Sequence, residues 1–181
     1  LRWIGYYLLL LLVTEICSKT LYHLSIPNLP ILHIYTLLEL VLLSIFYREI
    51  FSNNRKIIDV VTIVVSVFIV SNSFFIQDIN TFNSNAKTLQ QVVIIIYAIS
   101  FFFNFSFFEF NNRKIQQSLS LINSAILIYF SGSLFTFMFS QLFIDKRDAF
   151  LGFWAFNAFL SLLFQLLVFI SLWRIAFRKQ T

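Results

Sequence analysis

Residues 57–76 read IIDVVTIVVSVFIVSNSFFI, and the run VVTIVVSVFIV at 60–70 places apolar side chains on every face of a helix. A helix that is apolar all round is surrounded by lipid or by other helices. Crossing the hydrocarbon core of a bilayer takes about 20 such residues, whereas a transmembrane β-strand alternates apolar and polar residues over about 10. The stretch therefore predicts a transmembrane helix.

The composition of the whole chain indicates the same environment. Of its 181 residues, 59% are hydrophobic and 12% are charged, against about 25% charged residues in soluble domains. Only 3 Gly, 2 Pro and 1 Cys are present, which excludes Gly-rich phosphate loops, an intrachain disulfide and a Cys-cluster metal site. We expect an integral membrane protein whose main partner is the lipid bilayer.

Five further apolar runs are bounded by polar or charged clusters in the same way. The six predicted spans cover residues 3–20, 30–51, 57–76, 90–110, 118–143 and 149–177. Residues 77–87 are rich in Asn and Ser, and they are predicted to form the longest loop. These features predict an all-α polytopic transmembrane helical bundle that forms a single domain over residues 1–181.

The distribution of positive charge predicts the orientation, because Lys and Arg near span ends are retained on the cytoplasmic side. Nine of the 13 Lys and Arg residues fall at one set of span ends: Arg2, Arg48, Arg55, Lys56, Arg113, Lys114, Arg174, Arg178 and Lys179. The opposite ends carry Lys19, Lys87, Lys146 and Arg147. We expect a multi-pass protein of the cell inner (plasma) membrane with a cytoplasmic C-terminus. This topology and anionic lipid headgroups explain the net charge of +5, and no nucleic-acid partner is expected.

The start of the sequence leaves the number of spans in the full-length product open. Residue 1 is Leu, and the first apolar run begins almost at once. An additional upstream helix would give seven spans, the number in heptahelical receptors, although helix count alone is a weak analogy. A cleaved signal peptide is the other explanation, but Glu15 and Lys19 follow without a small-residue cleavage pattern.

One short motif occurs twice. The pentapeptide NNRKI stands at 53–57 and again at 111–115, each time after a Phe-rich span that ends in a glutamate, Glu49 or Glu109. Duplicated halves occur in transporter folds with the substrate site between them. Cytoplasmic hairpins also favour Asn, Arg and Lys for turn formation and for charge reasons, so duplication and compositional coincidence both stay open.

Glu39 is the residue that most directly suggests a function, because it lies near the middle of the second span among leucines. A carboxylate at this depth costs about 2.5–3.5 kcal/mol on insertion scales and faces a cavity or a partner. Tyr35 precedes Glu39 by four residues and so lies on the same helical face. The two are predicted to form a polar stripe. This stripe either contacts a ligand or a proton, or is a buried acid satisfied by Tyr35 or a neighbouring helix.

Glu15 and His33 lie at comparable depths, about 6–8 Å below the outer ends of their spans at ~1.5 Å per residue. They could form a Glu–His pair, which is the basis of a pH switch or a proton relay. Glu15 could instead pair with Lys19 at i,i+4, and His33 could be a hydrated histidine near a helix start. His33 and Glu39 are about 120° apart around the helix, so a metal site would need ligands from other spans.

Asn104, flanked by phenylalanines in the fourth span, is a further candidate ligand contact or an amide that bridges helices. The chain contains no Gly-x-Ser-x-Gly, His-Glu-x-x-His or Cys-x-x-Cys signature, so the usual hydrolase, metalloprotease and thiol-redox motifs are absent. We expect no cofactor and no metal. Enzymatic activity is left uncertain, with a binding role favoured over catalysis.

The stretch PILHIYTLLE at 30–39, followed by LLSIFY at 42–47, resembles a segment common in small, uncharacterised polytopic bacterial membrane proteins of six or seven spans. The resemblance covers mainly the second span. It implies a polytopic helical fold and draws attention to His33, Tyr35 and Glu39 as a set, but it implies no activity.

Three functions are therefore open. The first is a sensory or small-ligand or proton-binding module, with an outer-side pocket of Glu15, His33, Tyr35 and Glu39, that acts through a membrane or cytoplasmic signalling partner. The second is a small transporter, suggested by the mid-membrane acid and by the repeated motif. The third is a membrane-embedded lipid-modifying enzyme. The sequence does not specify the ligand or the oligomeric state.

Overall fold

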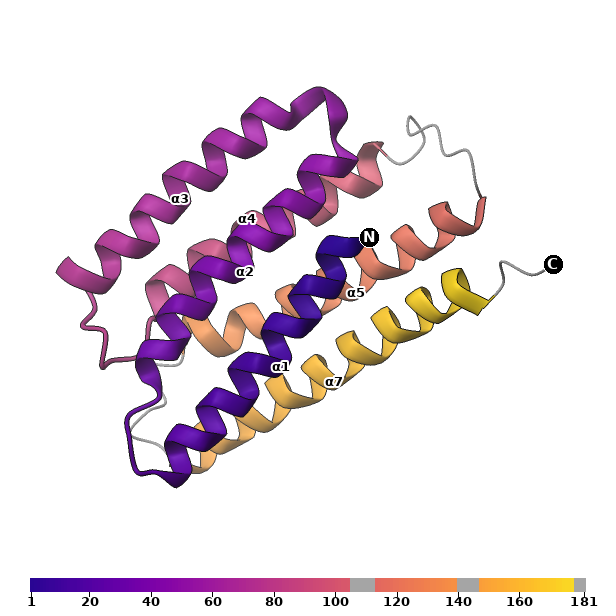
Figure 1. The fold of residues 1–181 in the computed structure, drawn as a ribbon. Helices are drawn as coiled ribbons and strands as arrows, with labels where there is room; N and C mark the ends of the chain where they lie inside the picture. The colour runs from indigo at the N-terminus through magenta and orange to yellow at the C-terminus, as the bar shows by residue number, and fades with distance from the viewer. Residues whose placement is uncertain (105–112, 140–146, 178–181) are drawn as a thin grey trace. The chain divides into compact units, whose positions relative to one another are not determined.

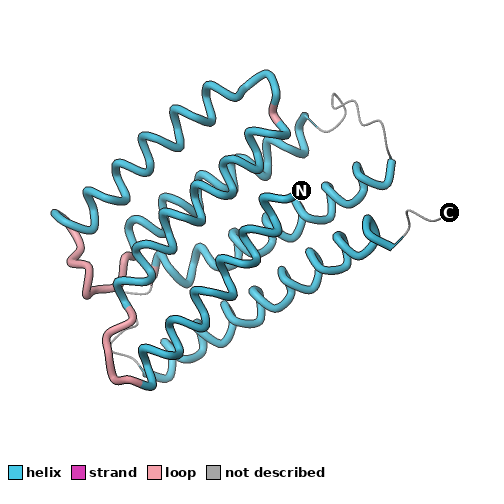
Figure 2. The backbone as a smooth tube through the Cα atoms, viewed as in Figure 1, coloured by secondary structure: helices cyan, strands magenta, loops and turns pink. Residues whose placement is uncertain are grey.

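The computed structural model describes residues 1–104, 113–139 and 147–177, and these residues form helices joined by turns (Figures 1 and 2). The elements are α1 (Arg2–His23), α2 (Leu29–Ile50), the short 3₁₀ helix η1 (Ser52–Asn54), α3 (Arg55–Phe75), α4 (Ser84–Asn104), α5 (Arg113–Met138) and α7 (Arg147–Phe177). Within the described residues, six helices are long and apolar enough to cross a membrane. The predicted all-α helical bundle is confirmed, and the protein is a multi-pass integral membrane protein.

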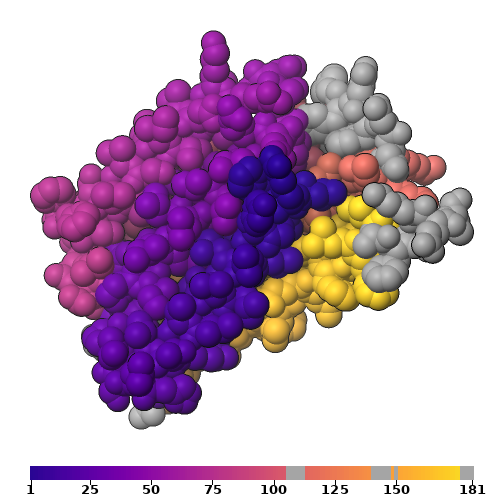
Figure 3. Space-filling view, viewed as in Figure 1, coloured from indigo at the N-terminus to yellow at the C-terminus, as the bar shows by residue number. Residues whose placement is uncertain are grey.

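The outward faces of the helices are apolar, as lipid requires. On α3 the exposed stripe recurs every three or four residues and consists of Ile57, Val60, Ile63, Val64, Val67 and Val70. On α1, which lies at the surface turned to the viewer in Figure 3, Leu9, Leu12 and Ile16 are exposed. Such a surface would aggregate in water and is matched to acyl chains.

The chain forms two compact units, residues 1–90 and residues 91–181. In the first unit, α2 packs against both α1 and α3. Pro30 lies in the first turn of α2, where its missing N–H costs no hydrogen bond. Leu40, Leu43 and Tyr47 recur at helical spacing and are fully buried in this unit, so α2 forms its central element.

The ends of these helices are joined by polar contacts. The indole nitrogen of Trp3 donates to the Glu49 carboxylate over 2.7 Å, and Arg48 forms a 2.7 Å salt bridge with Asp59. The second copy of the repeated motif cannot be compared with this region, because residues 105–112, including Glu109, lie outside the described residues. Possible duplication therefore stays a prediction.

The second unit consists of the remainder of α4 together with α5 and α7. α5 packs along α7, and the rings of Tyr129 and Phe164 lie 5.5 Å apart. Gly132 permits close approach, because a Cβ atom at this position would lie 2.5 Å from a methyl carbon of Leu160. The amide of Asn123 on α5 donates to the carbonyl of Ala98 on α4 over 3.0 Å.

Candidate functional site

Glu39 lies in the middle of α2 and is completely buried. At ~1.5 Å per residue, Glu39 lies about 15 Å along the helix axis from Leu29. This distance is about half the thickness of the hydrocarbon core. Its Oε2 atom forms a salt bridge with Nζ of Lys87 on α4, and both side chains are at most 3% exposed. A charge on one transmembrane helix is thus neutralised by a charge on another.

Two tyrosines complete the surroundings of this carboxylate. The hydroxyl of Tyr7 on α1 donates to Glu39 Oε1 over 2.7 Å, and that of Tyr35 on α2 donates to the same oxygen over 2.5 Å. Lys87 Nζ also lies 4.8 Å from the centroid of the Tyr35 ring, where the aromatic face attracts a cation. We call Tyr7, Tyr35, Glu39 and Lys87 the Glu39 cluster.

The energetics of the cluster depend on its completeness. Removing two charges from water costs several kcal/mol per ion, and only good geometry with additional hydrogen bonds offsets this cost. The Glu39 cluster has both the geometry and the additional hydrogen bonds. One carboxylate oxygen accepts a hydrogen bond from the Lys87 ammonium group, and the other accepts hydrogen bonds from two tyrosine hydroxyls. Loss of either charge would leave the other buried without its counter-charge.

The position of Lys87 corrects the sequence interpretation. The sequence predicts a loop over residues 77–87, but α4 begins at Ser84, and the backbone N–H of Lys87 donates to the carbonyl of Asn83 over 3.0 Å. The side-chain amide of Asn83 in turn donates to Thr36 Oγ1 over 2.8 Å. These bonds fix the start of α4 against α2 and direct Lys87 toward Glu39.

The polar residues at the start of α4 form one buried stripe. Asn83, Ser84, Lys87, Gln90 and Gln91 recur at spacings of three or four and are all buried, whereas Val92, Ile96 and Ile99 on the same helix are exposed. In a membrane helix this arrangement is expected, since polar groups face protein and apolar groups face lipid. The spacing itself is the sequence signal that could have identified Lys87 as a member of the site.

Gln90 adds hydrogen-bonding capacity one turn beyond Lys87. Both side-chain amide atoms of Gln90 are buried and make no hydrogen bond within the described part of the chain. The hydroxyl of Ser44 on α2 is also buried and makes no hydrogen bond to the described residues. Buried polar atoms of this kind normally have a partner, so a polar ligand or a rearranged side chain would be stabilised beside either of them.

The structure brings only part of the predicted site together. The predicted Tyr35–Glu39 pair is formed. The expected Glu15–His33 pair is not, because Glu15 instead forms a 3.0 Å salt bridge with Lys19 on the exposed face of α1.

His33 instead joins α2 to α3 and to the loop that follows α3. Its Nδ1 atom lies 2.7 Å from Ser73 Oγ, and its Nε2 atom lies 3.1 Å from the carbonyl oxygen of Thr81. Asn104 belongs to the second unit and donates to the carbonyl of Ser100 on its own helix over 2.8 Å. His33 and Asn104 therefore have partners other than Glu39 in the described structure.

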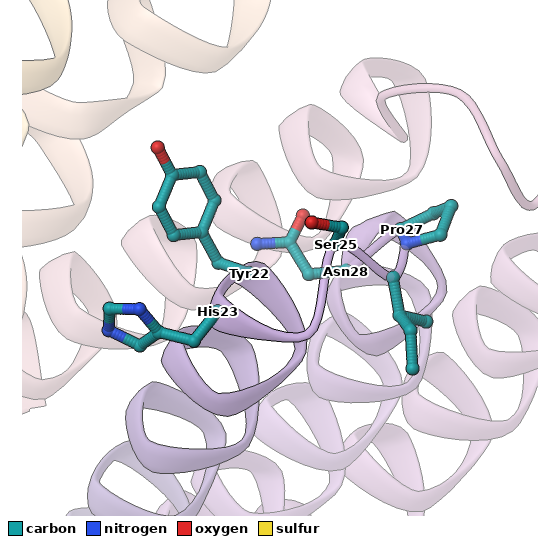
Figure 4. A pocket seen from close by; sticks show the side chains of 6 residues that line it. Tyr22, His23, Ser25, Pro27 and Asn28 are labelled. Carbon is teal, nitrogen blue, oxygen red and sulfur yellow. The ribbon is translucent and has the colours of Figure 1, made fainter.

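A wide, open surface pocket of about 610 Å³ lies at the turn between α1 and α2 (Figure 4). Its walls are formed by Tyr22, His23, Ser25, Ile26, Pro27 and Asn28. None of the residues expected to form an outer-side pocket belongs to this set. Within residues 1–104, 113–139 and 147–177, no group of three or more His, Cys, Asp or Glu side chains is arranged to hold a metal ion.

Comparison with known proteins gives no relative from which a role could be transferred: no family model matches the chain, and neither a curated protein nor a solved structure is similar to it. The geometry of the Glu39 cluster is therefore the feature from which a function can be inferred.

Proposed function

We propose that the protein is a membrane-embedded responsive module in which a proton or a small charged ligand breaks the Glu39–Lys87 ion pair. The observation that supports this proposal is the buried Glu39 cluster, which joins three helices through one carboxylate. Intramembrane charges are expensive and mark functional sites by default. A purely structural contact between these helices could be made by apolar side chains at lower cost.

Proton binding would act directly on Glu39. A protonated carboxyl group carries no charge to offset that of Lys87, so the ammonium group becomes an uncompensated buried charge. The groups that face Glu39 are Tyr7 from α1, Tyr35 from α2 and Lys87 from α4. The conformation in which Lys87 leaves the cluster is then favoured, and α1 and the start of α4 separate from α2.

A small anionic ligand would act on Lys87 instead. Its carboxylate or phosphate would replace Glu39 as the counter-ion of Lys87, while the buried amide of Gln90 would supply hydrogen bonds to the same molecule. Either stimulus alters the packing of the same three helices. In the proposed inner-membrane orientation, with the C-terminus cytoplasmic, a membrane or cytoplasmic signalling partner detects this change.

The sole cysteine of the chain, Cys17 on α1, allows a direct test. A spin label at Cys17 and a second label introduced by Asn85→Cys, at an exposed position in the first turn of α4, report the distance between these helices in lipid nanodiscs. We expect the distance distribution of this doubly labelled protein to change on acidification. In the Glu39→Gln background the change should already be present at neutral pH.

Glu15→Gln is the matched control, because it removes the same charge from an exposed position on α1. It should leave the acid-induced change intact. A distance distribution that is insensitive both to pH and to Glu39→Gln would exclude the proposed proton switch. Small carboxylates and phosphates added at neutral pH test the ligand-binding version with the same labels.

A small transporter is the second candidate function. It is favoured by the position of the Glu39 carboxylate halfway along α2, since transporters place ionisable groups at this depth. In sealed liposomes a transporter should move protons or a solute down an imposed gradient, and Glu39→Gln should abolish this flux. If neither the wild type nor the Glu39→Gln variant shows flux, and the spin-label distance still changes on acidification, the responsive module is favoured.

A further inference from the structure

The second unit contains a small basic cavity at the end of the α5–α7 pair. The cavity has a volume of about 100 Å³ and is lined by Lys114, Gln117 and Ser118 from α5 and by Arg174 from α7. This is the volume of about three water molecules at ~30 Å³ each, and it accommodates one phosphate group. All four residues belong to residues 91–181 and are separate from the Glu39 cluster.

Both helices contribute positive charge to this cavity. Lys114 lies in the first turn of α5, where the helix dipole already places positive potential, and this turn contains no acidic residue. Arg174 lies in the last turn of α7. Among the described residues, no carboxylate forms an ion pair with Arg174. A bound anion would contact two cations, and the N–H groups at the start of α5 would favour its charge.

The base of the cavity is held in a fixed geometry. The hydroxyl of Ser171 donates to the carbonyl of Ser118 over 2.8 Å, and the hydroxyl of Ser118 donates to the carbonyl of Ser171 over 3.4 Å. These reciprocal bonds join α5 to α7 one turn from Lys114. The two cations are therefore presented by two helices that are already fixed to each other.

The flanking residues indicate that the anion belongs to a lipid. Trp173 is next to Arg174 and is exposed, as is Phe169 one turn earlier, and the centroids of their rings lie 5.7 Å apart. On α5, Ile115 is next to Lys114 and is also exposed. Exposed Trp beside Arg is typical of the membrane interface, where the headgroup region meets the acyl chains. We propose that this cavity binds the phosphate of an anionic phospholipid headgroup, with acyl chains against the neighbouring apolar residues.

The test uses the full-length chain in detergent and native mass spectrometry of bound lipid. Wild-type protein should bind phosphatidylglycerol about tenfold or more tightly than phosphatidylcholine. The K114Q/R174Q variant should lose about fivefold in phosphatidylglycerol affinity for each cation removed. The charge-conserving K114R/R174K variant should retain the preference, which distinguishes loss of charge from loss of folding.

The matched control removes two cations from the start of α3. The R55Q/K56Q variant lowers the net charge by the same amount at exposed positions, and it should bind phosphatidylglycerol like the wild type. An equal loss in both double variants would overturn the proposal, because binding would then follow net charge alone. Inorganic phosphate is the second probe: if it displaces phosphatidylglycerol at equal concentration, the site takes free phosphate and the lipid assignment is wrong.

Discussion

The hydroxyl of Tyr7 on α1 donates to the carboxylate of Glu39 on α2 over 2.7 Å, and both side chains are completely buried. This bond links residues 32 positions apart in the sequence. It ties α1 to the same carboxylate oxygen that receives the Tyr35 hydroxyl. The first helix is therefore hydrogen-bonded directly to the acidic residue buried in the second.

Tyr7→Phe removes this hydrogen bond and retains the ring. Because the acceptor is a charged group, we expect the free energy of unfolding to fall by about 1–2 kcal/mol. Tyr6→Phe is the control, since Tyr6 is half exposed on the neighbouring face of α1, and its effect should stay below about 0.5 kcal/mol. Unfolding in mixed micelles by denaturing detergent measures both values. Equal effects of the two substitutions would contradict the buried hydrogen bond.

Glu39 and Lys87 should show strong energetic coupling. Each single substitution, Glu39→Met or Lys87→Met, leaves one buried charge alone and should destabilise the protein by about 3–5 kcal/mol. The double substitution removes both charges and should recover most of that loss. The same unfolding measurement gives the coupling energy of the cycle. Additive effects of the two substitutions would show that the charges do not interact.

His33→Ala should loosen the loop after α3 without unfolding the bundle. The substitution removes the contacts of His33 with Ser73 and with the Thr81 carbonyl. We expect faster hydrogen exchange in residues 77–83, which can be followed by mass spectrometry. His23→Ala, at the exposed end of α1, should leave exchange in this loop unchanged.

Gly132→Ala tests the close approach of α5 and α7. The new methyl group would overlap the end of the Leu160 side chain, and overpacking costs about 1–3 kcal/mol, reduced by the ~1 kcal/mol gain in helix propensity. Leu160→Val in the same chain should relieve the overlap and recover part of the loss. A Cβ at Gly5 would meet no atom within 4 Å. Gly5→Ala should therefore leave thermal stability in detergent unchanged or raise it.

The helical bundle could be predicted from sequence because the solvent imposes it. An apolar run as long as residues 60–70 has few other structures available in a bilayer, and this holds whatever the neighbouring helices are. The Tyr35–Glu39 contact could be predicted for a similar reason. Residues four apart on one helix meet without any tertiary information.

Contacts between helices were harder to predict, because depth does not determine which way a helix is rotated. Glu15 and His33 have comparable depths, but Glu15 lies on an exposed face of α1 and reaches Lys19 instead. The sequence predicts a loop at Lys87, because the polar start of a span resembles a connection between spans. Only the structure, in which Asn83 and Lys87 contact α2, shows that this polar segment is helical and buried.

The buried first turn of α4 also determines how the chain must enter the membrane. A lysine within a span inserts at a cost of about 2.5–3.5 kcal/mol on biological scales, and Gln90 and Gln91 follow it on the same face. The segment that carries Lys87 is synthesised after the one that carries Glu39, so the carboxylate is made before its counter-ion. A chain truncated before residue 84 would therefore leave Glu39 in the bilayer without its counter-ion.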